Sequence, residues 1–227
     1  MRLLLVGYGK MGRLVERLAP DYGFEVVGRL DDTNNIGGVG IPSAPDADVA
    51  VDFSVPSAVA ENLPKLAARR TNVVIGTTGW REHEEKMKRV AADAGIGVVA
   101  ASNFSLGVAL FQSLAEHAAK MFAAYPEYGA WIHEVHHATK KDAPSGTAIT
   151  LQQAMEAAGY NRAIDIASNR AGSVPGTHTI GFDGPFETMT MTHTNRDRAA
   201  FAQGALQAAR GVHGKRGWFT IQDVLGL

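Results

Sequence analysis

The chain of 227 residues contains no cysteine. Disulfides and thiolate metal ligands are therefore excluded, and a reducing cytoplasm is the compartment that suits such a chain. An excess of charge of one sign is also missing, because 22 lysines and arginines are balanced by 23 aspartates and glutamates, for a net charge of −1. This balance gives no reason to expect nucleic acid or an anionic membrane as a partner.

Long hydrophobic runs are absent as well. The N-terminal apolar stretch, residues 3–6, ends at glycines and is far too short for a signal peptide or a membrane span. The apolar fraction of 45% and the charged fraction of 20% are those of an ordinary globular protein. The length fits one large domain or two small ones.

The first half alternates short β-rich runs with helical stretches. The pattern predicts strands at 3–6, 25–30, 48–53, 72–75 and 97–101, and helices at 11–18, 57–70 and 81–94. Continuous apolar strands separated by helices are typical of a parallel sheet that is covered on both faces. With right-handed crossovers, such a chain forms a Rossmann-type, doubly wound α/β fold.

The pattern changes after about Gly107. A helix at 108–123, a strand at 130–137, a second helix after Ser145 and threonine-rich strands such as 187–194 predict a second, α+β domain with a mixed or antiparallel sheet. The helix at 198–209 and the ending at 217–224 should return to the first domain, since a lone helix needs a face to bury against. We therefore expect a dinucleotide-binding domain at 1–106 and 198–227, and a substrate-binding and oligomerisation domain at 107–197.

A glycine-rich turn follows the first predicted strand and opens the first helix. In a GxGxxG turn the glycines permit the sharp bend, the approach of a pyrophosphate and the close packing of the helix on the strand. Asp31 lies nineteen residues beyond the last of these glycines, where a carboxylate would bind the ribose hydroxyls of adenosine. A purely structural turn is the alternative, but the position of Asp31 favours dinucleotide binding by Gly7, Tyr8, Gly9, Lys10, Met11 and Gly12.

The residues after the second strand bear on the choice of cofactor. Asp31 and Asp32 would repel a 2′-phosphate, and we expect Arg29 to point elsewhere on its strand. NADH is therefore predicted to be preferred over NADPH, although Lys10 could offset the repulsion.

Two more loops follow predicted strands at the sheet edge where open α/β sheets bind ligands. Each carries small residues with amide or hydroxyl groups, and either loop alone could be a simple polar turn. Together they are predicted to line the nicotinamide and its ribose, through Gly76, Thr77 and Thr78 in one loop and Ala101, Ser102, Asn103 and Phe104 in the other.

The densest cluster of chemistry-bearing residues is 134–148, EVHHATKKDAPSGTA. Ser145 is expected to cap a helix whose first N–H groups, at Gly146 and Thr147, form an anion site suited to a carboxylate. Lys140 can bind a second carboxylate or donate a proton, and His136 lies on the strand just before it. A lone histidine is usually structural and a lone lysine usually solvated, so the clustering carries the functional interpretation.

Residues 133–137 also match the HExxH pattern of zinc proteases. That chemistry needs a helix, which brings both histidines to one metal. Residues four apart on a strand are separated by about 13 Å, at ~3.3 Å per residue. Because the segment alternates like a strand, we expect no metal here.

The run E-V-H-H-x-x-K-x-D-A-P-S-G-T-A resembles the signature of the 4-hydroxy-tetrahydrodipicolinate (dihydrodipicolinate) reductase family. The segments DFS at 52–54, GTTG at 76–79, NFS at 103–105 and VPGT at 174–177 fall in the family's order, so the resemblance covers nearly the whole chain. It implies NAD(P)H-dependent reduction of 4-hydroxy-tetrahydrodipicolinate, a cyclic dicarboxylate, to tetrahydrodipicolinate in diaminopimelate and lysine biosynthesis. It also implies a homotetramer built through sheets of the second domain.

Carried over to matching positions, the resemblance makes His136 the catalytic donor or acceptor and Lys140 the proton donor. It makes His137, Gly146 and Thr147 substrate ligands, and the glycine turn, Asp31 and the two loops cofactor contacts. The chain departs from many members in being shorter between 172 and 182, and in having Asp32 where some carry a basic residue. The alternatives are another NAD(P)-dependent reductase of a small carboxylated substrate, similar to aspartate dehydrogenase, and a catalytically silent NADH sensor.

Overall fold

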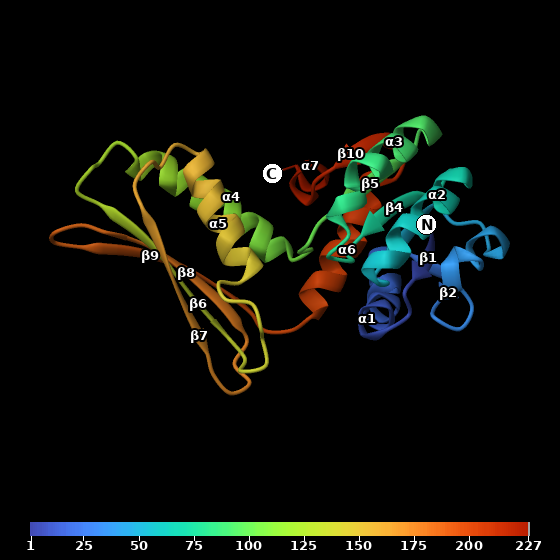
Figure 1. Ribbon diagram of the computed structural model, residues 1–227, viewed down its shortest axis with the longest axis horizontal. Helices are drawn as coiled ribbons and strands as arrows, with labels where there is room; N and C mark the ends of the chain where they lie inside the picture. Colours follow the sequence, from blue (N-terminus) through green and yellow to red (C-terminus); the bar gives the residue numbers. More distant parts are fainter. Residues whose placement is uncertain (227) are drawn as a thin grey trace. The chain divides into compact units, whose positions relative to one another are not determined.

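The computed structural model describes residues 1–226. It divides into two compact units, each with its own sheet: unit 1 comprises Met1–Leu106 and the chain from Ala199 onward, and unit 2 comprises Gly107–Arg198 (Figure 1). The second boundary lies one residue beyond the position expected from the sequence.

Unit 1 contains a six-stranded, all-parallel sheet in the order β10-β5-β4-β3-β1-β2. The chain passes from β1 outward to β2 on one side and back to β3 on the other, so the strand order reverses between β1 and β3. This arrangement confirms the predicted doubly wound fold, and the reversal is where such sheets bind ligands. The strands are β1 (Arg2–Val6), β2 (Glu25–Leu30), β3 (Val49–Asp52), β4 (Asn72–Ile75), β5 (Gly97–Ala100) and β10 (Gly217–Phe219).

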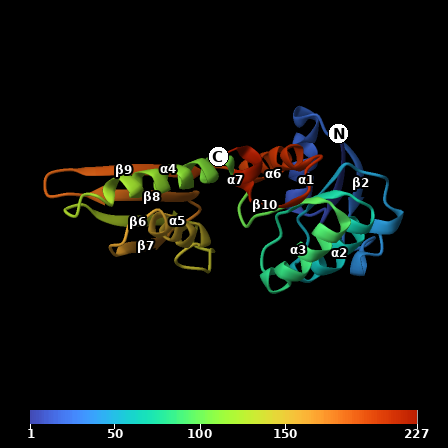
Figure 2. The ribbon, with the colours of Figure 1, turned by 90° about the horizontal axis from the view of Figure 1, so that it is seen from above.

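Helices cover both faces of this sheet. On one face, Leu4, Val6 and other strand residues share an apolar core with α2 and α3, which lie side by side (Figure 2). The alternate residues Leu3 and Leu5 are equally buried, and α6 packs on α1 and on the central strands. The helices of unit 1 are α1 (Lys10–Leu18), α2 (Pro56–Ala68), α3 (Glu84–Ala94), α6 (Ala199–Val212) and α7 (Ile221–Leu225), with short 3₁₀ turns at Ala19–Tyr22, Ile36–Gly38, Ile41–Ser43 and Arg81–His83.

Unit 2 contains a four-stranded mixed sheet in the order β7-β6-β8-β9, as the predicted fold class required. The pair β6–β7 is parallel, whereas β6–β8 and β8–β9 are antiparallel. Both helices lie on the same side of the sheet (Figure 1), where Ile132, Ile180 and Phe182 pack against Phe111 and Leu151. The elements are α4 (Leu106–Phe122), β6 (Gly129–His136), α5 (Gly146–Ala157), β7 (Ile164–Arg170), β8 (Gly176–Asp183) and β9 (Thr188–Asn195).

Between residues 1 and 226, no helix is both long enough and apolar enough to cross a membrane.

One close approach in unit 1 generates a stability prediction. Helix α6 passes so near the loop after β5 that a Cβ at Gly204 would overlap the carbonyl oxygen of Phe104. We expect Gly204→Ala to destabilise unit 1 by about 2 kcal/mol or more, because two backbones would have to separate. Thermal unfolding by circular dichroism should show a Tm lowered by about 5 °C or more.

The matched control is Gly9→Ala in the same unit. A Cβ at Gly9 meets no heavy atom within 4 Å among the described residues, so the Tm should stay within about 2 °C of the unsubstituted value. Equal Tm values for the two variants would contradict the packing argument.

Candidate functional site

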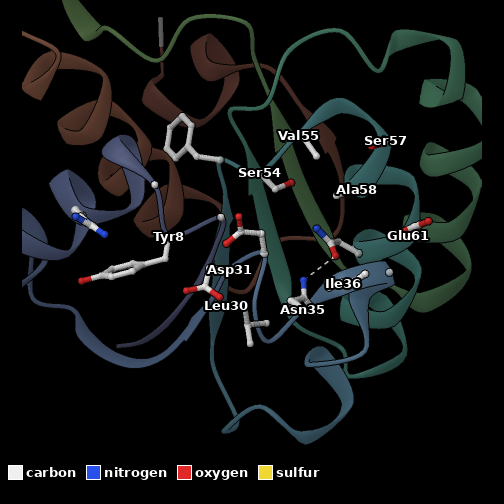
Figure 3. Close-up of a pocket in the computed structure, with 17 residues that line it drawn as sticks. Tyr8, Leu30, Asp31, Asn35, Ile36, Ser54, Val55, Ser57, Ala58 and Glu61 are labelled. Atoms are coloured by element: carbon white, nitrogen blue, oxygen red, sulfur yellow. Dashed lines mark hydrogen bonds between the residues drawn. The ribbon is translucent and has the colours of Figure 1, made fainter.

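A cavity of about 750 Å³ lies at the switch point of the unit 1 sheet (Figure 3). Its walls come from the loops that follow β1, β2 and β3 and from the start of α2, as expected for a ligand site in an open α/β sheet. Four residues predicted to bind the cofactor line it: Gly7, Tyr8, Gly9 and Asp31. The other lining residues are Arg13, Leu30, Asp32, Asn35, Ile36, Gly37, Phe53, Ser54, Val55, Ser57, Ala58, Glu61 and Asn62.

The three glycines of the turn have different surroundings. Gly7 has a φ of +87°, and a Cβ there would overlap the backbone of Phe53. A Cβ at Gly12 would come within 2.5 Å of the Gly7 carbonyl oxygen, so this glycine lets α1 pack on the turn. The space above Gly9 is open, and this is the opening that a pyrophosphate needs. The turn therefore fits a dinucleotide.

Hydrogen bonds fix the carboxylate of Asp31 at the cavity wall. Its Oδ1 accepts from the backbone N–H of Thr33 at 2.9 Å and from the Thr33 hydroxyl at 2.6 Å. These bonds hold the pKa of Asp31 below its ordinary value. Arg29, in contrast, donates to Glu16 on α1, so its guanidinium is engaged there.

The other predicted cofactor residues are not among the described residues that line this cavity. Lys10 and Met11 form the first turn of α1, the loop 76–78 follows β4, and the loop 101–104 follows β5. The ring of Phe53 connects the two loops: it fills the space that a side chain at Gly76 would need, and its centroid lies 6.4 Å from that of Phe104.

A buried carboxylate, Asp52, anchors the same edge of the sheet. It accepts hydrogen bonds from the backbone N–H and hydroxyl of Ser54, from Asn62 Nδ2 at 3.0 Å and from Thr77 Oγ1 at 3.0 Å. Asn62 in turn accepts from Asn35 (dashed in Figure 3). Burial raises the pKa of Asp52, although these donors oppose the rise. The chain of bonds ties the Thr77 loop to the loop after β2.

In unit 2, residues 133–137 form the end of a strand and the residue after it. His133 is exposed, whereas Glu134 is fully buried, as strand alternation requires. The structure therefore lacks the helix that the HExxH chemistry of zinc proteases needs.

Glu134 is the centre of the polar cluster in unit 2. Arg170, at the end of the neighbouring strand β7, binds it with both terminal nitrogens, at 2.9 Å to Oε2 and 2.7 Å to Oε1. The Nδ1 atom of His136 contacts Oε2, and the backbone N–H of Ser145 donates to Oε1 at 3.2 Å. Burial alone would raise the pKa of Glu134, but hydrogen bonds led by Arg170 lower it to about 2.

A second histidine, His178 on β8, lies beside His136, with ring centroids 5.1 Å apart and the planes nearly perpendicular. Its Nε2 pairs with the hydroxyl of Ser145 at 2.9 Å. That hydroxyl accepts from Ala148 N–H at 3.2 Å, so Ser145 is the helix cap that the sequence predicts. Burial lowers the pKa of both histidines, and for His178 to about 4.

Lys140 lies in the loop between β6 and α5. Its Nζ is 2.8 Å from both carboxylate oxygens of Asp142, and the nearby backbone N–H of Gly146 joins Lys140 in lowering the pKa of this carboxylate. His137 pairs with the hydroxyl of Thr139 at 2.7 Å. The structure thus brings Lys140 and the first residue of α5 together around one carboxylate, that of Asp142.

Glu134, His136 and His178 each offer a ligand atom within 4.8 Å of the other two, which is a possible arrangement for a metal. The guanidinium of Arg170 already occupies both oxygens of Glu134. A metal cation there would have to displace that cation, so the donor set does not fit a resident metal.

Comparisons with known proteins agree with this geometry. The N-terminal model of dihydrodipicolinate reductase matches residues 1–104, and the C-terminal model matches residues 107–225. The chain belongs to the dihydrodipicolinate reductase family. This membership confirms the family that the sequence motifs indicate.

Two relatives named 4-hydroxy-tetrahydrodipicolinate reductase are similar over almost their whole length. The one from Christiangramia forsetii is 36% identical over 99% of this chain and 98% of the relative, and the one from Xanthomonas euvesicatoria is 40% identical over 96% and 94%. A solved structure, dipicolinate-bound dihydrodipicolinate reductase from Paenisporosarcina sp. TG-14, superposes with a TM-score of 0.79 at 24% identity and covers 97% of each chain. The family and the Rossmann-type unit together make the chain a reductase with a nicotinamide cofactor.

Several residues of this candidate site were not predicted from the sequence. Asp142 lies inside the central motif, and Glu134 shares a strand face with His136. The sequence alone could therefore have indicated that both residues belong to the site. Arg170 and His178 reach the cluster only through the register of β7 and β8 with β6. Arg13, on the cavity wall, follows directly after the last glycine of the turn.

The buried polar cluster predicts how stability depends on pH. His178 takes up its proton near pH 6.5 when unfolded and near pH 4 when folded, so the unfolded state binds more protons between these values. The titration of His178 therefore leaves stability unaffected above pH 6.5 and lowers it by up to about 3 kcal/mol as the pH drops to 4. The depressed pKa of Glu134 adds a further loss from about pH 4.5 down to about 2.

Urea unfolding at a series of pH values measures this slope. His178→Gln, which keeps a hydrogen-bonding partner for Ser145, should reduce the slope between pH 6.5 and 4. An unchanged slope would show that His178 is not the group responsible.

Proposed function

We propose that the chain reduces 4-hydroxy-tetrahydrodipicolinate to tetrahydrodipicolinate with NAD(P)H, in the diaminopimelate route to lysine. The observation that carries the site assignment is the carboxylate held in unit 2. Lys140 binds the side chain of Asp142, and the nearby backbone N–H of Gly146 also lowers the pKa of that carboxylate, so these groups have the right chemistry for a substrate carboxylate.

The reaction removes the 4-hydroxyl group as water and adds a hydride and a proton to the ring. The nicotinamide supplies the hydride when it is bound. Hydride addition at C4 places negative charge on the enamine-like system of the ring, and a proton at C3 completes the product. The residues of this chain have to hold the two carboxylates, stabilise that charge and deliver the proton.

Lys140 is assigned as the proton donor and His136 as a neutral partner. Burial lowers the pKa of His136, so its ring is uncharged at neutral pH, and Nδ1 is occupied by Glu134. An uncharged imidazole bonded in this way orients its neighbours or accepts a proton. The ammonium group of Lys140 carries positive charge and three N–H donors. It therefore suits both stabilisation of the anionic ring and protonation at C3.

The second set of substrate contacts lies at the start of α5. The Ser145 hydroxyl caps α5 by accepting from the backbone N–H of Ala148. The positive end of the helix dipole lies at this first turn and favours an anion there. Gly146 has open space above its Cα, which leaves room for a ligand. Gly146 and Thr147 are assigned to one substrate carboxylate, and His137, just beyond the end of β6, to substrate binding as well.

Unit 1 is assigned to the cofactor and unit 2 to the substrate. The cavity of unit 1 has a glycine turn with an opening at Gly9 and a ribose-binding carboxylate at Asp31, and the loops 76–78 and 101–104 follow strands at the same edge of the sheet. We also assign a cytoplasmic location, which suits a chain without cysteine, and a homotetramer. The tetramer would form through the face of the unit 2 sheet opposite α4 and α5, where β9 carries threonines at alternate positions.

Oxidation of NADH, followed by absorbance with freshly generated 4-hydroxy-tetrahydrodipicolinate, tests the proposed function. The expected result is turnover that depends on both the substrate and the enzyme. No turnover above background would overturn the assignment. Turnover with aspartate in the reverse, NAD⁺-dependent direction would instead favour the alternative reductase.

Lys140→Ala should lower kcat by about a hundredfold or more, because it removes the proton donor and the cation beside the ring. NADH affinity, measured by fluorescence titration, should change less than twofold, since Lys140 lies in unit 2 and the cofactor cavity in unit 1. The matched control is Lys141→Ala, at the exposed neighbouring lysine, with kcat close to the unsubstituted value. If both variants kept full kcat, Lys140 would lose its assigned role.

NADH is proposed as the preferred cofactor, with a higher kcat/KM than NADPH. Asp31 and Asp32 lie on the cavity wall, and Arg13 is the one cationic side chain among the described residues that line it, since Arg29 is bound to Glu16. We expect Asp32→Asn to raise kcat/KM for NADPH about fivefold, because it removes one charge that repels a 2′-phosphate. Arg13→Ala should lower kcat/KM for NADPH. A preference for NADPH in the unsubstituted protein would contradict the proposal.

A further inference from the structure

The carboxylate of Glu134 is fully buried, and both of its oxygens have several partners. Oε1 accepts from Arg170 and from the backbone N–H of Ser145, and Oε2 accepts from Arg170 and contacts His136 Nδ1. A carboxylate in the sheet interior is costly unless such donors surround it. Because so many donors converge on it, Glu134 is ionised and accepts every one of these bonds.

An ionised carboxylate determines the tautomer of its imidazole partner. Since Glu134 has no proton to give, Nδ1 of His136 must carry the hydrogen. The neutral ring then has its lone pair on Nε2. On that side lies Gly176, the first residue of β8, where a Cβ would come within 2.8 Å of Nε2. Glu134 and the space above Gly176 together fix both the tautomer and the orientation of the ring.

The same ion pair reaches the two other parts of the proposed active site. Arg170 Nη2, besides its bond to Glu134, donates to the backbone carbonyl of Asp142 at 2.6 Å, in the loop that carries Lys140. Glu134 Oε1 accepts from the backbone of Ser145, the residue that caps α5. One buried pair thus bonds directly to the histidine, to the lysine loop and to the start of the anion-binding helix.

We propose that Glu134, held by Arg170, is a positioning residue: it sets the Nδ1–H tautomer of His136 and fixes the Lys140 loop and the start of α5 around the substrate. This inference rests on the proposed function, because that function assigns catalytic or substrate-binding roles to His136, Lys140 and Gly146. Its structural half, the tautomer of His136, is independent of any activity.

The first experiment therefore uses the unsubstituted protein without substrate. Long-range ¹H–¹⁵N correlation spectra of the histidine rings at pH 7.5 report which nitrogen carries the hydrogen, and His136→Asn identifies the signal. The expected result is an Nδ1–H ring at position 136. An Nε2–H ring would overturn the proposal whether or not the protein reduces the proposed substrate, and this measurement needs no variant of Glu134 to fold.

The second experiment is kinetic and uses Glu134→Gln. The amide keeps the shape but can donate to Nδ1, so we expect an Nε2–H ring and a kcat lowered about tenfold to a hundredfold. KM for NADH should change less than twofold, because unit 1 is untouched. The matched control is Glu156→Gln, an exposed glutamate on α5, with unchanged kcat and spectra. Glu134→Asp, which retains the charge, should restore the Nδ1–H ring and part of kcat.

Arg170→Lys separates the two functions of the pair. It keeps the positive charge but cannot span both oxygens and the Asp142 carbonyl at once. We expect the Nδ1–H ring to remain while KM for the dicarboxylate rises about fivefold or more. A normal kcat in folded Glu134→Gln, with turnover present in the unsubstituted protein, would overturn the positioning role. Absence of turnover in the unsubstituted protein would instead overturn the proposed function and leave the tautomer result standing.

Discussion

The buried ion pair between Glu134 and Arg170 is the interaction on which unit 2 depends. A charged carboxylate inside a four-stranded sheet is tolerable only because a bidentate guanidinium and further donors surround it, and removing one partner of such a pair typically costs about 3–5 kcal/mol. The pair joins β6 to β7 side chain to side chain, and through Asp142 and Ser145 it also bonds to the chain between β6 and α5. The pair therefore connects two strands and the loop that follows β6.

Unit 1 also contains a buried carboxylate, but its partners are of a different kind. Asp52 is almost as deeply buried as Glu134, yet its partners among the described residues are hydroxyls, an amide and a backbone N–H, with no lysine or arginine. Neutral donors compensate a charge less well than a guanidinium does, so the pKa of Asp52 is raised whereas that of Glu134 is lowered. In both units, a buried carboxylate at the end of a strand organises the loops that carry the proposed site.

Local patterns in the sequence predicted most of this fold, because they depend on neighbours in the chain. The strands 25–30 and 72–75 match β2 and β4, and the expected cap at Ser145 is present. Strands β7 and β8 were not delimited, since 164–170 is mostly polar and lies at a sheet edge, where alternation is weak. Arg170 and His178 were not predicted either, because their contacts with β6 arise from strand register, which no local spacing encodes. The assignment of the named site residues to substrate and cofactor stays a prediction.

The ion pair between Lys140 and Asp142 has a consequence for how any ligand enters. Lys140 already holds the carboxylate of Asp142, so a substrate carboxylate that binds there, as proposed, would exchange with this anion. The Coulomb energy gained would then be only the difference between two similar contacts, and we expect a monocarboxylate to bind weakly. For a dicarboxylate, the first carboxylate would replace Asp142 and the second would add a contact that Asp142 does not make.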